Sequence, residues 1–185
     1  MSKITPPPSL LIAPPNMPDP RFAKSVLLLT HHQQGGSSAI CINRPTEHVV
    51  SDVLKELDLD FELHFPVYWG GPVNSGVVWM LHSSEWAMED TVAINDHWSM
   101  TSDVGMFAHL ADHDCPRYFR ITVGMCTWGP GQLQMELDGT PPWNKSNSWL
   151  VTDNPGPEWL FEQDPETLWD QATELCGRQA VKSWF

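Results

Sequence analysis

Two apolar segments separated by a pair of glycines place the strongest constraint on how this chain folds. Residues 25–31 and 38–43 are apolar at nearly every position, and Gly35 and Gly36 lie between them. A Gly-Gly pair between two such segments predicts a β-hairpin. Strands that are apolar on both sides are typical of a sheet that is covered on both faces. The chain is therefore expected to fold around a sheet with further layers on either side.

Short strand and helix patterns follow one another in irregular order along the rest of the chain. Further strands are expected at residues 9–13, 66–69, 76–82, 91–95, 117–126 and 148–152. Helices are expected at residues 52–57, 103–112, 130–138, 157–161 and 165–180. Because the strands come in groups with helices interspersed irregularly, this pattern favours an α+β fold over a doubly wound one.

The length and the apolar runs set the expected organisation and compartment. A chain of 185 residues suits one domain, here expected at residues 9–185 after a flexible, proline-rich tail at 1–8. The apolar runs are far too short to cross a bilayer, and Pro6, Pro7 and Pro8 interrupt the stretch that a signal peptide needs. Four widely spaced cysteines suit free thiols. These features predict a soluble, cytoplasmic protein with no membrane partner.

The charge balance excludes one class of partner. The chain has 10 Lys and Arg against 23 Asp and Glu, which gives a net charge of −13. Binding to a nucleic-acid backbone depends on basic side chains that neutralise phosphates, and a strongly acidic protein repels a polyanion. Residues 51–100 are the most acidic part, with one basic and nine acidic side chains. Direct binding to nucleic acid is therefore not expected.

Two glycine-rich turns are the clearest backbone signals outside the hairpin, at residues 70–71 and 129–131. Glycine permits positive φ and lets a backbone approach a neighbour closely. One interpretation is tight turns at strand ends. The other is that the amides of these turns, with Arg44 nearby, hold an anionic or carbonyl group. Neither turn matches a phosphate-binding or dinucleotide-binding motif, so no cofactor is expected.

Two further patterns suggest chemistry, each beside a plainer interpretation. Cys126 lies between a predicted strand and a predicted helix, where a helix N-terminus can activate a thiol. A buried structural cysteine is the alternative. His109 and His113 are four residues apart, with Cys115 close behind, a spacing that can offer ligands to zinc. With no fourth ligand in the pattern, a solvated helix end is the alternative, and no metal site is assigned.

Several motifs occur in an order and spacing that together are specific. They are Leu10-Leu11-Ile12-Ala13, Met17-Pro18-Asp19-Pro20-Arg21-Phe22, Asn43-Arg44-Pro45, Pro66-Val67-Tyr68-Trp69-Gly70-Gly71-Pro72-Val73, Leu81-His82, and Trp128-Gly129-Pro130-Gly131-Gln132-Leu133 with Glu136. From about residue 9 to residue 180 the chain thereby resembles the YqgE/AlgH family. The resemblance implies a single α+β domain in which a mixed, bifurcated sheet forms a pseudo-barrel flanked by short helices. It also implies a function that is largely unsettled. The family's label of transcriptional regulator comes from an effect on gene expression, not from a recognisable DNA-binding motif.

Our first functional hypothesis is a non-enzymatic module that binds a small ligand or a protein partner, so that any regulation of transcription is indirect. Arg44 would supply a forked, charged donor, and Gln132 an amide near a helix N-terminus. The residues expected at this site are Asn43, Arg44, Gly70, Gly71, Trp128, Gly129, Gly131 and Gln132.

Two alternatives come from other classes of protein. The first is a small hydrolase or transferase that uses Cys126 or a pair of carboxylates, which needs a base within reach of the nucleophile. The second is an interaction scaffold whose acidic, tryptophan-rich surface at residues 86–101 binds protein partners. A concave pocket favours the binding module, and an exposed apolar patch favours the scaffold.

Overall fold

The predicted hairpin is present and is covered on both faces. In the computed structural model, which describes residues 6–140 and 149–182, β2 (Val26–Gln33) pairs with β3 (Gly36–Cys41) in antiparallel register. Leu28 and Ile40 belong to one hydrophobic cluster, whereas Leu27 and Leu29 belong to another. Because successive side chains of a strand point to opposite faces, both sides of this hairpin are buried.

Ten strands and five helices occur among the described residues. The strands are β1 (Leu10–Ile12), β2, β3, β4 (Pro45–Val49), β5 (Pro66–Trp69), β6 (Val73–Ser83), β7 (Val92–Ala93), β8 (Trp98–Thr101), β9 (Phe119–Trp128) and β10 (Leu150–Thr152). The helices are α1 (Val50–Glu56), α2 (Met106–Ala111), α3 (Gln132–Asp138), α4 (Pro157–Glu162) and α5 (Leu168–Lys182). None of these helices is long and apolar enough to span a membrane.

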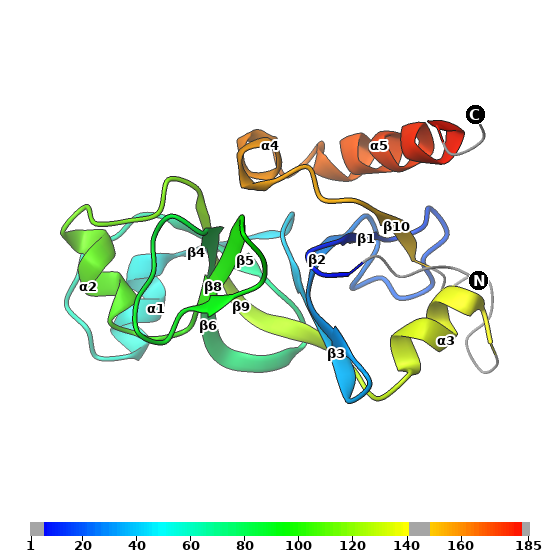
Figure 1. Ribbon diagram of the computed structural model, residues 1–185. Coiled ribbons are helices and arrows are strands. Elements are labelled where there is room, and N and C mark those ends of the chain that lie inside the picture. The colour runs from blue at the N-terminus through cyan, green and yellow to red at the C-terminus, as the bar shows by residue number, and fades with distance from the viewer. Residues whose placement is uncertain (1–5, 141–148, 183–185) are drawn as a thin grey trace.

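Strand β9 is the point at which the sheet divides (Figure 1). Along one edge it pairs antiparallel with β6. Along the other, residues 121–123 pair with β5 in parallel, and residues 126–128 pair with β3 in the opposite direction. The main path of the sheet runs β10-β1-β2-β3-β9-β6-β8-β7, with β4 paired to β5 off this path. The sheet is therefore mixed, bifurcated and curled, and with its flanking helices it forms the α+β fold that the resemblance implies.

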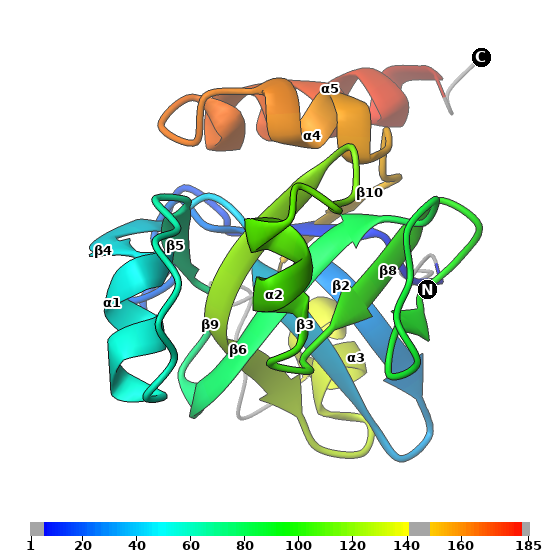
Figure 2. The same ribbon diagram turned by 90° about the vertical axis from the view of Figure 1, so that its left-hand side faces the viewer.

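The helices cover different parts of the curled sheet (Figures 1 and 2). Helices α4 and α5 lie over one face of the β1–β3 region, where Leu160 and Leu168 join its core. Helix α3 covers the opposite face through Leu133. Helices α1 and α2 close the far end against β6 and β9, with Leu54 and Phe107 fully buried there.

The 70–71 turn is a close crossing between two strands. The Gly70 N–H donates to the carbonyl oxygen of Val123 at 2.8 Å, and the Gly70 carbonyl accepts from the Cys41 N–H at 2.8 Å. Gly71 has φ +155°, and a Cβ atom at this position would overlap the backbone of Met125. Glycine is required here because the β5–β6 connection passes directly against β9.

Two of the strands, β4 and β8, were not predicted from the sequence. Strand β4 lies at an edge and is largely exposed, so no apolar alternation marks it, whereas β8 is buried at every residue and shows no alternation either. Of the expected tail, residues 1–5 lie outside the described residues. The Pro8 carbonyl accepts a hydrogen bond from Asn154 at 2.7 Å.

Candidate functional site

The side chain of Asn43, just after β3, is hydrogen-bonded to the backbone at the start of β2 and in the loop that precedes it. Its side-chain oxygen accepts from the Val26 N–H at 2.8 Å, and its Nδ2 donates to the Lys24 carbonyl at 2.8 Å. Both ends of the amide therefore hold the backbone in place. The consequence for the site is indirect: Asn43 fixes where the next residue, Arg44, leaves the sheet.

Arg44 lies beside the Trp69 ring, and both residues line a hollow in the surface. Its guanidinium is 5.6 Å from the centre of the Trp69 ring, and Nη2 donates to the Ala23 carbonyl at 2.6 Å. The hollow has a volume of about 360 Å³ and is lined by Arg21, Arg44, Pro45, Trp69 and Pro72. The guanidinium carries five N–H donors, of which the bond to Ala23 uses one.

A larger, aromatic cleft adjoins this hollow. It has a volume of about 390 Å³, and Arg21 and Pro72 border both concavities. Of the residues expected at the site, Trp128 and Gln132 line this cleft. The full lining is Met17, Pro18, Asp19, Arg21, Phe22, Pro72, Val73, Cys126, Thr127, Trp128, Gln132, Glu136 and Trp149.

The base of the cleft is organised by one buried carboxyl group. Glu136 is 9% exposed and accepts hydrogen bonds from Trp128 Nε1 at 3.0 Å and Trp149 Nε1 at 3.1 Å. Gln132 Nε2 donates to the other carboxyl oxygen at 3.1 Å. Three side chains from different segments are thereby locked in fixed rotamers. A buried network of this kind makes the cleft rigid.

The glycines after Trp128 build the turn into α3. The Gly129 N–H donates to the side-chain oxygen of Gln132 at 3.0 Å, and Gly131 has φ +72° as the residue before the helix. The side-chain amide of Gln132 thus bonds the turn on one side and Glu136 on the other. Its role is to hold the cleft together rather than to offer a free amide to an anion.

An ion pair lies at the mouth of the cleft. Arg21 donates to Asp19 through Nη2 at 2.7 Å and Nε at 3.1 Å, and these bonds lower the pKa of the Asp19 carboxyl. The charge of Arg44 acts on Asp19 in the same direction, so both arginines lie near this carboxylate. The Arg21 side chain is 60% exposed. Two guanidinium groups against one carboxylate leave the mouth positive.

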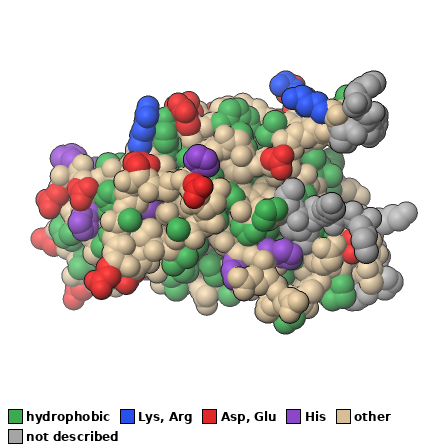
Figure 3. Space-filling model, viewed as in Figure 1, with side chains coloured by type: hydrophobic (Ala, Val, Ile, Leu, Met, Phe, Trp, Pro, Cys, Tyr) green, Lys and Arg blue, Asp and Glu red, His purple; other side chains and the backbone are tan. Residues whose placement is uncertain are grey.

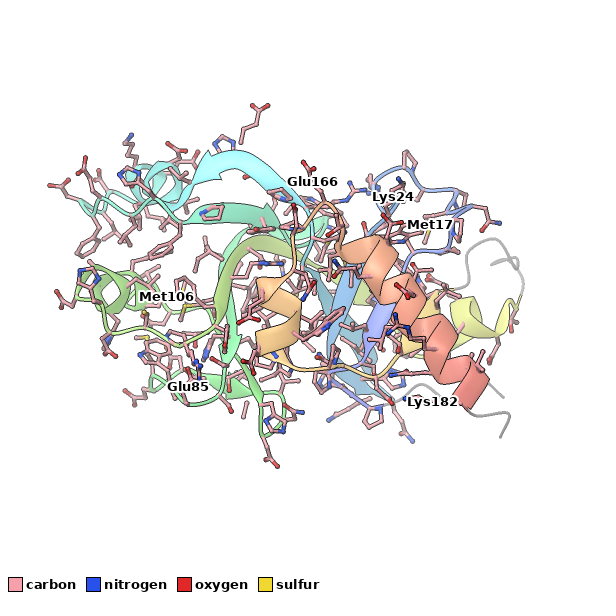
Figure 4. All side chains as sticks on the ribbon, turned by 90° about the horizontal axis from the view of Figure 1, so that it is seen from above. Met17, Lys24, Glu85, Met106, Glu166 and Lys182 are labelled. Carbon is pink, nitrogen blue, oxygen red and sulfur yellow. The ribbon has the colours of Figure 1, made fainter. Side chains whose placement is uncertain are left out.

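The loop that forms this mouth packs against the C-terminal helix. Seen from above, the segment that carries Met17 and Lys24 lies beside the connection that carries Glu166 (Figure 4). Lys24 Nζ lies 5.7 Å from the centre of the Trp169 ring, and Trp169 Nε1 donates to the Ala13 carbonyl at 2.8 Å. Helix α5 therefore holds the loop from behind.

Cys126 borders the cleft but lacks the features of a nucleophile. Its thiol is 3% exposed and donates to the Gly70 carbonyl at 3.5 Å, an acceptor that cannot take up its proton. Burial raises the pKa of this thiol well above its ordinary range. A thiolate is the reactive form, so the arrangement suits a structural cysteine.

The structure does not bring the residues of the possible zinc pattern together as a set of ligands. His109 Nδ1 bonds Asp114 at 2.7 Å instead, and Cys115 is exposed. Over residues 6–140 and 149–182, no group of three or more His, Cys, Asp or Glu side chains is arranged to hold a metal ion. The helix end is a solvated hydrogen-bonded turn.

The 86–101 segment is acidic at its surface, but its tryptophans are engaged in the fold. Trp98 is 1% exposed, and Trp86 Nε1 donates to Asp114 at 3.0 Å. Acidic side chains are spread over the end of the molecule formed by α1 and α2, with Lys and Arg at few places on the same face (Figure 3). One of these tryptophans is thus buried and the other is half-buried and hydrogen-bonded, so the exposed surface of the segment is acidic rather than rich in tryptophan.

Sequence reasoning missed part of the cleft. Arg21, Phe22 and Trp149 line it, although the first two were noted only as part of a family motif. The ring of Phe22 lies 5.7 Å from those of both Trp69 and Trp149, so it joins the hollow to the cleft. The Arg21-Phe22 pair in the family motif was the signal that pointed to this part of the cleft.

Comparison with known proteins shows the family to which this chain belongs. The AlgH-like family matches residues 10–181, and the chain belongs to that family. A UPF0301 protein of Methylococcus capsulatus is 31% identical over 90% of this chain and 87% of its own length. A UPF0301 protein of Cupriavidus metallidurans is 33% identical over 90% and 86%.

Two solved structures share the fold. The AlgH protein of Pseudomonas aeruginosa, solved in solution, has a TM-score of 0.77 and 28% identity, covering 96% of this chain and 93% of that one. A crystal structure of a Corynebacterium diphtheriae protein has a TM-score of 0.69 at 19% identity, covering 93% and 87%. At that identity the second likeness concerns the fold alone.

Proposed function

We propose that this protein is a non-enzymatic module that binds a small ligand with one anionic group and one flat, apolar group. The observation that carries the proposal is that Arg21 and Pro72 border both concavities. The hollow offers the guanidinium groups of Arg21 and Arg44, and the adjoining cleft offers aromatic surface. A ligand that spans the two would meet charge at one end and rings at the other.

The composition of the two subsites supports this chemistry. Arginine is the residue best suited to a planar, bidentate bond with a carboxylate or phosphate. Ligand sites are concave and mostly apolar, with few polar groups that fix orientation. The cleft has this character, with Phe22, Trp128 and Trp149 around a carboxyl group that already bonds the chain.

We further propose that any effect on transcription is indirect, through such a ligand or a protein partner. A net charge of −13 disfavours direct contact with nucleic acid. The described cysteines are free, which suits a reducing compartment such as the cytoplasm.

The test uses phenylacetate and its neutral counterpart, phenylacetamide, on the full chain. Binding is followed by the indole N–H resonances of Trp128 and Trp149, which report on the cleft directly. We expect phenylacetate to shift these resonances and phenylacetamide to bind roughly 10-fold more weakly, because it cannot form a charge-assisted bond. Arg44→Gln should weaken phenylacetate binding by roughly the same factor.

The matched control is Arg178→Gln, which removes an exposed arginine from α5 far from the cleft. It should leave binding unchanged. The proposal fails if phenylacetate at about 10 mM leaves both indole resonances in place, since that concentration reveals even weak binding. Equal binding of the acid and the amide would also contradict it.

A further inference from the structure

A second arginine, Arg120, lies inside the fold rather than at its surface. It is 6% exposed, on the central strand β9. Its guanidinium lies between two rings, 4.4 Å from the centre of Tyr68 and 4.7 Å from that of Phe161. Nη1 donates to the Ile42 carbonyl. A side chain with five N–H donors is thus held in one position with one protein acceptor among the described residues.

Among the residues that the structure describes, no acidic side chain forms an ion pair with this buried charge. Burial lowers the pKa of the guanidinium. Arginine stays protonated in proteins, so it cannot escape the cost of burial by losing its proton. Buried charges are ordinarily paired, because desolvation of an unpaired ion is strongly unfavourable.

Arg120 lines a hollow of about 310 Å³, together with residues of β5, β9 and α4. Helix α4 lies on the same side of the sheet as α5 (Figure 1). Arg117 lines it as a second positive group. None of the described residues around it is acidic, although the chain as a whole carries 23 acidic residues. The lining is otherwise aromatic or aliphatic, consisting of Phe65, Pro66, Tyr68, Tyr118, Phe119, Ile121 and Phe161.

We propose that this hollow is a second binding site, in which Arg120 and Arg117 hold the oxyanion of a small ligand that carries a flat ring. The oxyanion supplies the missing opposite charge to Arg120. The ring packs against the walls formed by Phe65, Tyr68 and Phe161. This site is separate from the cleft at Trp128, and the inference does not depend on the function proposed for that cleft.

Two carboxylates of α4 lie close to Tyr118, one of the residues that line the hollow. The Tyr118 hydroxyl donates to Glu162 Oε1 at 3.4 Å. Burial raises the pKa of this hydroxyl, and the charges of Glu158 and Glu162 raise it further, against the charge of Arg117. Among the described residues, neither carboxylate lines the hollow or forms an ion pair with Arg120. Their charge disfavours an anion at Tyr118 and favours one that is held at Arg120.

The test compares phenyl phosphate with inorganic phosphate, using wild-type protein and Arg120→Met in a buffer without other oxyanions. Backbone amide resonances of Tyr68 and Ile121 report on this hollow, and the indole resonances of Trp128 and Trp149 report on the cleft. We expect phenyl phosphate to shift the amides of Tyr68 and Ile121. Arg120→Met should weaken this binding roughly 10- to 100-fold, as loss of a charged hydrogen-bond donor does.

The two ligands separate the parts of the proposal. Phenyl phosphate should bind more tightly than inorganic phosphate, because its ring gains contact with Tyr68 and Phe161. Equal affinities would overturn the assignment of the ring. If wild type and Arg120→Met bind phenyl phosphate equally, or the amides of Tyr68 and Ile121 do not shift, the site itself is overturned.

Two further variants keep both arginines in place. One tests the aromatic wall of the hollow, and the other tests the nearby carboxylate of Glu162. Phe161→Leu keeps both arginines and removes one wall, so it should weaken phenyl phosphate more than inorganic phosphate. Glu162→Gln should bind as tightly as wild type or more tightly, because it removes a negative charge beside Tyr118. Weaker binding would contradict the proposal that the arginines alone hold the oxyanion. In a folded wild type, saturating phenyl phosphate should raise the Tm by about 3 °C, and Arg120→Met should lose this shift.

Discussion

The cleft at Trp128 and the hollow at Arg120 treat a buried polar group in opposite ways. In the cleft, the Glu136 carboxyl accepts from two indole N–H groups and from Gln132. In the hollow, the Arg120 guanidinium bonds one carbonyl and lies between two rings, and it has no ion-pair partner among the described residues. Both groups are more than nine-tenths buried, with Glu136 9% exposed and Arg120 6% exposed.

This difference in hydrogen bonding distinguishes the two roles. The Glu136 carboxyl group gives its site a fixed shape, whereas the Arg120 guanidinium is available to bind the anionic group of a ligand. A carboxyl group bonded by the chain itself gives the cleft a fixed form and leaves recognition to its rings and to the arginines at the mouth. A charge that the chain does not neutralise is costly until something neutralises it. The two concavities therefore predict opposite responses to mutation.

The largest effect is expected from Glu136→Leu, which removes the carboxyl group that accepts the hydrogen bonds of the cleft. The change leaves the N–H groups of Trp128, Trp149 and Gln132 buried without their acceptor, at about 1–3 kcal/mol for each unsatisfied group. We expect a loss of about 3–5 kcal/mol in the free energy of unfolding, measured by urea denaturation. Glu136→Gln keeps one acceptor and should lose less.

Exposed Glu166 supplies the control for that experiment, since Glu166→Gln removes a carboxylate from a surface connection. It should alter stability by no more than about 0.5 kcal/mol. A similar small effect from Glu136→Leu would show that the carboxyl group does not organise the cleft.

A smaller effect is expected from Gly71→Ala, at the strand crossing that lies between the two sites. The added methyl group would overlap the backbone of Met125, and the residue would keep a positive φ. We expect destabilisation of about 2–3 kcal/mol in urea denaturation, together with weaker ligand binding at both concavities. Gly76→Ala is the matched control, because open space surrounds Gly76. Equal stability of the two variants would mean that the crossing is loose.

The smallest effect concerns His82, a third buried polar group, which resembles Glu136 in being satisfied by the chain. Its Nδ1 donates to the Ser83 carbonyl at 2.9 Å, and its Nε2 accepts from the Thr101 hydroxyl at 2.9 Å. Burial lowers the pKa of His82 below the ordinary value of 6.5, against the opposing influence of the Ser83 carbonyl and Glu85. The native ring therefore stays neutral where the unfolded ring takes up a proton.

The sign of the pH effect follows from that difference. As the pH falls below about 6.5, the unfolded chain gains a proton that the native chain refuses, so the free energy of unfolding decreases, by at most about 1.4 kcal/mol per pH unit. His82→Gln should reduce this slope in urea denaturation between pH 7 and pH 5.5. The surface variant His97→Gln should keep it. If His82→Gln leaves the slope unchanged, the pH dependence arises from other groups. One such group is His32, because burial lowers its pKa as well.

Much of the fold follows from local patterns. The hairpin at Gly35–Gly36, the α+β class and the terminal helix were all predicted, because apolar periodicity and glycine turns act over a few residues. Strands β4 and β8 were missed, since an exposed edge and a fully buried strand show no alternation. The family resemblance implied a bifurcated sheet, which no local pattern contains, and the structure shows that the sheet divides at β9.

Less of the candidate site could be predicted. The residues expected there are divided by the fold: Arg44, Trp128 and Gln132 line the concavities, whereas Asn43, Gly70 and Gly71 hold the backbone. A glycine pair has the same appearance in a sequence whether it approaches a ligand or a neighbouring strand. Only the distance to β9 distinguishes the two.

Arg120 shows the same limit most clearly. In the sequence it alternates with apolar residues of its strand, and this pattern indicates a half-exposed strand with a polar face. Tertiary structure reverses that expectation, because Tyr68 from β5 and Phe161 from α4 close over the guanidinium. By itself the sequence determined the covered hairpin, the acidic charge and the glycine turns, since these depend on neighbours along the chain. Which arginine became a surface group and which a buried charge was decided by segments about 40 to 50 residues away, because burial is a property of packing and not of local pattern.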